Sequence, residues 1–229
     1  MKTTLPFLAL AGFALASSVT IADDSSTTTE ALATPVQHHL GSSGHRRFHT
    51  ANVFDAALGP GHRKGAAWLI RSRNHIKGRI ASYVPTAGDP YTLWVIVFNN
   101  PSACAGPICG EADLANPDVK GSVFYGNGAI SADNGKGNGV VNMDVDIVGG
   151  SLANDQFVLL GDGNGMRRNK GFKAQLTLIV DQHPSIMPGT DSWIGDLTTT
   201  NFPGAGPAMN NAIAVFDSCK THSCPDSVL

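Results

Sequence analysis

Asp181 and His183 are the two side chains of this chain whose types and spacing most directly suggest chemistry. They end an alternating strand pattern, and side chains two residues apart on a strand point to the same face. A carboxylate beside an imidazole can orient it as a general base or as a ligand for a divalent metal. Because no Ser or Cys nucleophile is tied to the pair by sequence, a strand-end pair that satisfies the turn before Pro184 is the favoured interpretation. The alternative is a metal site in which His75 or His222 is a further ligand.

The four cysteines form two pairs with the same spacing, Cys104 with Cys109 and Cys219 with Cys224. In an exported chain such pairs predict disulfides, and the two local rings are favoured among the three possible connectivities. Closing so small a loop is worth about 2 kcal/mol in the chain-entropy model. The alternative is a four-thiolate zinc site, but zinc sites usually space their cysteines more closely and an oxidising compartment competes for the thiols.

Asn142, Asp144 and Asp146 alternate along a second predicted strand and so share one face. Together with Asp162 they could bind a hard cation such as calcium. The run lacks the closely spaced acidic ligands and the bidentate Glu of a calcium loop. A solvated strand face is therefore the favoured interpretation.

Two other groups of residues have a simple structural explanation. Five of the eight histidines fall between His38 and His62, where His45 and His49 have the i, i+4 spacing of helical metal ligands. That segment is otherwise polar, so a solvated linker is favoured. The aromatic residues Trp94 and Tyr125 could stack against sugars if they were exposed together, but aromatic side chains usually fill the core of a β-sandwich.

Three regions follow from the composition along the chain. Residues 1–22 have the positive start, the short apolar core and the small residues of a secretory signal peptide. Residues 23–64 are poor in large apolar side chains and predict a flexible tail, with a short ordered piece at Phe48–Leu58. The folded domain should span residues 65–229. No later segment is long and apolar enough to cross a bilayer, and a formal net charge of -2 gives no case for nucleic acid.

Strand signals recur through the expected folded domain, and no segment shows a sustained helical period. Phe172–Asp181 and Val140–Val148 alternate between apolar and polar residues, which predicts one face in a core and one in water. Tyr91–Phe98 is apolar on both faces and predicts a central strand. The fold class is therefore all-β, an antiparallel two-sheet β-sandwich of about eight strands with local disulfides. The expected strands are Ala66–Arg71, Arg79–Val84, Tyr91–Phe98, Ser122–Ser131, Val140–Val148, Gln156–Leu160, Phe172–Asp181 and Ala212–Asp217.

The stretch Tyr91–Gly110, YTLWVIVFNNPSACAGPICG, resembles a group of uncharacterised secreted bacterial proteins. Members carry a Tyr-Thr-Leu/Val-Trp-x-x-x-Phe-Asn-Asn-Pro-x-x-Cys segment followed by Cys-Gly and an acidic stretch. A looser similarity covers Ala174–Pro184, where relatives tend to have Glu and His at the positions of Gln175 and Thr177. The pattern is also distantly similar to CHRD domains, which are β-sandwich modules of secreted proteins. The resemblance implies a β-sandwich and an exported location, and it brings no established activity.

These observations favour a secreted or periplasmic, non-catalytic protein that binds an extracellular or envelope ligand. Its expected contact surface is the pair of long loops Asn99–Asp113 and Pro184–Asn211, and no reaction is identified. One alternative is a metal-binding protein or metal-dependent enzyme centred on His183 and Asp181, with a divalent metal as its cofactor. The other is a purely structural role in the envelope.

Overall fold

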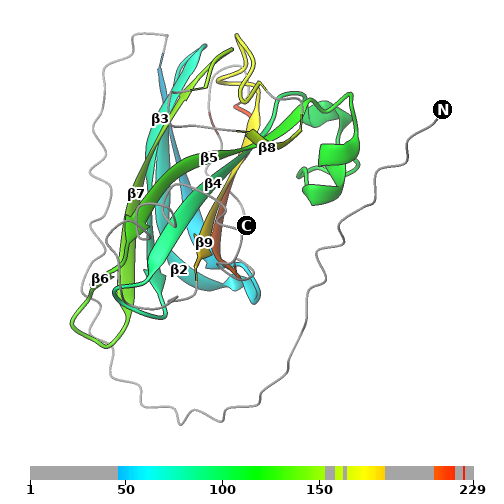
Figure 1. Ribbon diagram of the computed structural model, residues 1–229. Coiled ribbons are helices and arrows are strands. Elements are labelled where there is room, and N and C mark those ends of the chain that lie inside the picture. The colour runs from blue at the N-terminus through cyan, green and yellow to red at the C-terminus, as the bar shows by residue number, and fades with distance from the viewer. Residues whose placement is uncertain (1–45, 153–157, 162–163, 184–208, 220–223, 225–229) are drawn as a thin grey trace, which may run out of the picture. The chain divides into compact units, whose positions relative to one another are not determined.

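The computed structural model describes residues 46–152, 158–161, 164–183, 209–219 and 224, and these residues form one antiparallel sheet of ten strands (Figure 1). Two short 3-10 turns, η1 (Pro101–Ala103) and η2 (Glu111–Ala115), lie between the fourth and fifth strands. The strands are β1 (Arg47–Asp55), β2 (Gly59–Arg71), β3 (His75–Val84), β4 (Pro90–Phe98), β5 (Gly121–Ile130), β6 (Ala132–Asp133), β7 (Gly139–Val148), β8 (Val158–Gly161), β9 (Gln175–Gln182) and β10 (Met209–Phe216).

The sheet consists of two halves of five strands, in the order β6-β7-β3-β2-β1 and β10-β9-β4-β5-β8. Only two residue pairs, Phe54 with Ile213 and Asp55 with Ala212, join β1 to β10. On the other side the halves approach again, because Asn127 Nδ2 of β5 donates to the carbonyl of Asp144 in β7 (2.9 Å). The predicted all-β class and the two local disulfides, Cys104–Cys109 and Cys219–Cys224, are confirmed. The strands nevertheless form a single sheet, since the short β1–β10 ladder makes the two halves continuous, and the sheet does not close.

One face of each half points into a shared core, and strand alternation selects the residues. In β7 the inward residues are Val141, Met143, Val145 and Ile147, whereas Asn142, Asp144 and Asp146 are exposed, as predicted. Leu176, Leu178 and Val180 of β9 meet them from the other half. This cluster explains why the sheet folds over, since neither half can bury its apolar face alone.

Each of the eight predicted strands overlaps a strand of the structure, but the predicted tail boundary at residue 64 is wrong. β1 begins at Arg47, and β2 begins at Gly59. The inward residues of β1 are His49, Ala51 and Val53, and the first two add little to an apolar pattern, so the segment resembles a tail in composition. The predicted signal peptide and most of the predicted tail, residues 1–45, lie outside the described residues.

The outer face of the second half is also covered, which the alternation of Phe172–Asp181 did not predict. Gln175, Thr177 and Asp181 were expected in water, and all three are buried. Part of this face is covered by residues 99–120, which include the green coil at the upper right of Figure 1, since Leu114, Cys109 and Val119 pack with Ile96 and Phe98. Central strand β4 is buried on both faces, as predicted. Among the described residues, no helix is long and apolar enough to cross a membrane.

Candidate functional site

The Asn99-Asn100-Pro101 sequence after β4 is a structural junction. Asn99 is fully buried, and its Nδ2 donates to the carbonyls of Lys120 (2.8 Å) and Gly165 (3.0 Å). Its Oδ1 accepts a hydrogen bond from the backbone N–H of Arg167 (2.8 Å). One side chain thus joins the end of β4 to two distant segments, and this role accounts for an asparagine at this point of the motif.

Asn100 fixes the other side of the same junction. Its Nδ2 donates to the carbonyl of Asp118 (3.0 Å), and its Oδ1 accepts from the Ser102 hydroxyl (2.9 Å). Nearby Lys120 has a φ of 56°, in the left-handed region that non-glycine residues rarely adopt. Because both the backbone and the side chain of Asn99 donate to its carbonyl, this conformation is held in place.

Two adjoining cavities, of about 490 and 630 Å³, open around this junction and share Asn99, Asn100 and Lys170. The first lies between the disulfide loop and the segment before β9, and it is also lined by Pro101, Ser102, Cys104, Gly106, Pro107, Lys173, Ser218 and Cys219. The second is also lined by Ala103, Asp118, Lys120 and Arg167. The lining comes from segments that are distant in the sequence, and Asn99 joins two of them, near residues 120 and 165, to the end of β4.

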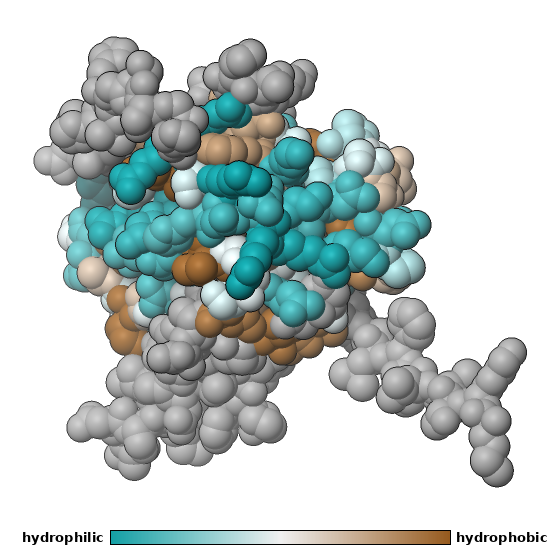
Figure 2. Space-filling model, turned by 90° about the horizontal axis from the view of Figure 1, so that it is seen from above, coloured by the Kyte–Doolittle hydropathy of each residue, from teal (hydrophilic) through white to brown (hydrophobic). Residues whose placement is uncertain are grey.

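The charge of these cavities is strongly asymmetric. Lys120, Arg167, Lys170 and Lys173 contribute four cations, and Asp118 contributes the only carboxylate of the lining residues. None of the ion pairs between described residues includes one of the three lysines. Figure 2, which looks down on the end of the sheet where residues 164–174 lie, shows mainly hydrophilic residues. The site can therefore attract anions, although the chain as a whole has a formal net charge of -2.

The Cys104–Cys109 ring forms one wall of this site and is attached to the sheet by Gln175. The Gln175 side chain accepts from the Cys109 backbone N–H (3.0 Å) and donates to the Cys109 carbonyl (3.1 Å), and both groups are buried. A glutamate carboxylate at this position could not donate the second bond. The Asp113 carboxylate accepts from the N–H groups of Ala105 and Gly110, and these bonds lower its pKa.

Asp181 and His183 lie where the sequence predicted, on one face of the sheet. Asp181 pairs in register with Thr92 of β4, and the Thr92 hydroxyl oxygen lies 2.9 Å from His183 Nε2. Both residues are buried rather than half-exposed. Burial raises the pKa of Asp181 to about 7 and lowers the pKa of His183.

The geometry around Asp181 and His183 gives little support to a metal site. No group of three or more potential metal-ligating side chains among the described residues contains either of them. His75, one proposed further ligand, bonds to Asp146 on the opposite half of the sheet, and His222 lies outside the described residues.

The other predicted candidates have structural partners. Asp144 receives two hydrogen bonds from Arg79, and Asp146 pairs with Lys77 and His75, so these two proposed calcium ligands form cross-strand ion pairs. Asp162 lies outside the described residues. The helical spacing of His45 and His49 does not apply, because His49 lies in strand β1 and its side chain is buried.

The aromatic pair Trp94 and Tyr125 is buried with an edge-to-face contact at 6.2 Å, as the core interpretation predicted. Of the large hydrophobic side chains in the described loop Asn99–Asp113, only Ile108 is exposed. The surface of this loop is thus polar and cationic, not apolar. The sequence did carry a signal for it, since Arg167, Arg168, Lys170 and Lys173 fall within seven residues.

The inward-facing Arg71 was also missed, although it continues the alternation of Ala67 and Leu69 into the core.

Comparison with known proteins adds nothing to this geometry, because no family model, curated protein or solved structure matches the chain.

Proposed function

We propose that this chain is an exported, disulfide-stabilised β-sandwich module that acts by binding, and that its ligand is anionic and occupies the two cavities around Asn99 and Asn100. The observation that carries the proposal is the convergence of four cations and one carboxylate on these cavities. Two disulfides suit an oxidising compartment. The division of the sheet into two five-strand halves over one core supports the description as a sandwich.

The arrangement of the cations favours a ligand with more than one anionic group. Lys173 lines one cavity, Lys120 and Arg167 line the other, and Lys170 lines both. Lysine provides a point charge with rotatable donors, so the site suits carboxylate, phosphate or sulfate groups without selecting one planar geometry. An acidic polymer, with charges repeated along its length, fits this description best.

Binding can be measured by isothermal titration calorimetry with three probes: short-chain polyphosphate, a sulfated oligosaccharide and an oligogalacturonate. The variant to compare is Lys170→Gln/Lys173→Gln. Removing two half-screened charges should cost about 1–2 kcal/mol, which corresponds to a 5- to 30-fold weaker affinity. Binding should also weaken between about 50 and 300 mM salt, because the contacts are exposed.

The matched control is Lys77→Gln/Lys136→Gln, which changes the net charge equally but removes lysines from β3 and from the β6–β7 turn. We expect this control to bind like the unmodified protein. If both double variants lose affinity to the same extent, the attraction is a property of net charge, and the proposed site is wrong.

The two alternatives make different predictions. A metal-dependent protein centred on Asp181 and His183 should hold about one ion per chain after dialysis and lose thermal stability on chelation, since a metal bound only by the native state stabilises it. A purely structural protein should bind none of the three probes at any salt concentration. The residues Ile186, Met187, Trp193 and Phe202, whose burial would favour the structural role, lie outside the described residues.

A further inference from the structure

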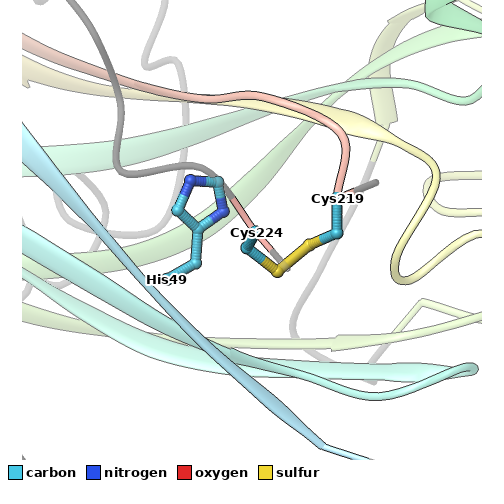
Figure 3. A group of neighbouring side chains, drawn as sticks. All are labelled: His49, Cys219 and Cys224. Carbon is cyan, nitrogen blue, oxygen red and sulfur yellow. A yellow bond between two sulfur atoms is a disulfide. The ribbon is translucent and has the colours of Figure 1, made fainter. Parts of the chain in front are cut away.

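The Cys219–Cys224 disulfide lies at one end of the core beside two nitrogen-bearing side chains. The ligand atoms of His49, Cys219 and Cys224 all lie within 4.8 Å of one another, and Figure 3 shows the imidazole of His49 beside the disulfide. Arg71 Nη1 lies 3.7 Å from the Cys219 sulfur. The ring therefore packs against groups that favour negative charge on sulfur.

Arg71 carries a buried charge. Its guanidinium donates to the carbonyls of Ala174 (3.1 Å), Phe216 (3.4 Å) and Asp217 (3.0 Å). No ion pair between described residues includes it. Burial lowers the pKa of Arg71 to about 9, and the charge of Asp217 opposes this shift, so the guanidinium is still protonated at neutral pH. A thiolate on Cys219 would give this cation a contacting counter-charge that the disulfide cannot give.

The Cys104–Cys109 disulfide provides an internal comparison. Both rings join cysteines five residues apart, and one sulfur-bearing residue of each, Cys104 and Cys219, lines the same cavity. The electrostatic surroundings are opposite, because the Asp113 carboxylate lies within 4.8 Å of both sulfurs of the first ring. Cys109 Sγ also lies 3.7 Å from the carbonyl oxygen of Pro101. These neighbours disfavour a thiolate.

We propose that Cys219–Cys224 is a redox-active disulfide that exchanges with an external thiol or dithiol, whereas Cys104–Cys109 is structural. The thiolate of the reductant attacks the Cys224 sulfur, the S–S bond breaks, and Cys219 leaves as the thiolate that faces Arg71 and His49. If the reductant is a dithiol, its second thiol then attacks the reductant sulfur of the mixed disulfide. This step releases Cys224, which takes up a proton. The dithiol is oxidised by two electrons to a cyclic disulfide, and the protein gains one thiolate and one thiol.

The test is a redox titration of the whole protein with mixtures of reduced and oxidised dithiothreitol at about pH 8, quenched with N-ethylmaleimide. Trypsin then separates the sites, since Cys104 and Cys109 lie on peptide 80–120, Cys219 on 174–220 and Cys224 on 221–229. Lowering a thiol pKa from about 8.5 to about 7 favours the reduced form roughly tenfold at this pH. We therefore expect half of Cys219 and Cys224 to be labelled at a low ratio of reduced to oxidised dithiothreitol. This ratio should be at least about tenfold lower than the ratio that half-labels Cys104 and Cys109. Equal midpoints, or the reverse order, would overturn the proposal.

Two variants separate the electrostatic cause from access to solvent. Arg71→Met should bring the two midpoints together by making Cys219–Cys224 harder to reduce. Asp113→Asn should also bring the two midpoints together, by making Cys104–Cys109 easier to reduce. This variant leaves Arg71 in place, so the test holds even if Arg71→Met does not fold. A gap between the midpoints that both folded variants leave unchanged would refute the role of these charges.

The direction of attack has its own readout. With glutathione as the reductant, the mixed disulfide should be trapped on peptide 221–229, because Cys219 is the better leaving group. An adduct found mainly on peptide 174–220 would contradict the assignment of Cys219 as the leaving sulfur.

Discussion

Replacing Asp181 by Asn should stabilise the protein at neutral and alkaline pH and leave it almost unchanged near pH 4. Asp181 is 8% exposed, and among the described residues its buried Oδ1 has no hydrogen-bond partner. Burial raises its pKa from 3.8 to about 7. The folded protein therefore keeps a proton on Asp181 over a pH range in which the unfolded chain has lost it.

The size of the effect follows from proton linkage. Between pH 3.8 and about 7 the folded state binds one more proton at this site, so the free energy of unfolding falls as pH rises, by about 1.4 kcal/mol per pH unit. Over the whole interval the upper limit is about 4 kcal/mol, and roughly 2–4 kcal/mol is expected after relaxation around the charge. Asn has the shape of the protonated acid and no charge, so it avoids this loss.

The assay is urea denaturation of the wild type and of Asp181→Asn at intervals from pH 4.5 to 8. The difference between the two curves isolates Asp181 from His183, whose lowered pKa works in the opposite direction, since it lowers stability as pH falls. The control is Asp144→Asn, which breaks one exposed ion pair with Arg79 and should cost no more than about 1 kcal/mol. Parallel curves for wild type and Asp181→Asn would refute the reasoning, and a less stable variant at pH 8 would indicate a bound cation instead.

Three further substitutions test the packing that supports the site, each by urea denaturation. Gln175→Glu removes the donor to the Cys109 carbonyl and buries a charge, so it should cost roughly 2–4 kcal/mol of stability. The control is Asn142→Asp on the exposed face of β7, which should change stability by less than about 0.5 kcal/mol. Gly78→Ala should cost roughly 2–3 kcal/mol, because a Cβ there would overlap the carbonyl oxygen of Trp68; a neutral result would mean that β2 and β3 can move apart. Asn99→Ala removes the three hydrogen bonds of a buried side chain, so it should cost roughly 2–4 kcal/mol and weaken polyanion binding. Asn100→Ala, at a half-buried position, should have a smaller effect, and equal effects would contradict the anchoring role of Asn99.

The strands could be predicted from the sequence where β-branched and aromatic residues alternate, as in β7 and β9. β1 was missed as part of the ordered domain because its inward positions hold His49 and Ala51, which add little to an apolar pattern. The continuity of the sheet could not be predicted either, because it rests on two residue pairs between β1 and β10, more than 150 residues apart. The burial of Gln175 and Asp181 depends on packing over the outer face of β9, which strand periodicity does not encode.

The candidate site was predictable only in its loop. The Asn-Asn-Pro sequence located the junction, but the cavity forms because Asn99 binds residues near position 120 and position 165. Side-chain spacing along one strand cannot reveal such convergence. Asp181 and His183 were correctly placed on one face, yet their burial changes the interpretation from a reactive pair to a carboxyl and an imidazole with shifted pKa values.

The measurement that tests the central claim most directly is an NMR titration of the full chain, labelled with nitrogen-15, with the polyanion that binds best. We predict chemical-shift changes at the backbone amides of Lys120, Arg167, Lys170 and Lys173 and at the side-chain amide of Asn100, with saturation at one ligand per site and reversal on adding salt. Shifts confined to another face of the sheet, or no shifts with any of the three anion classes, would contradict the account.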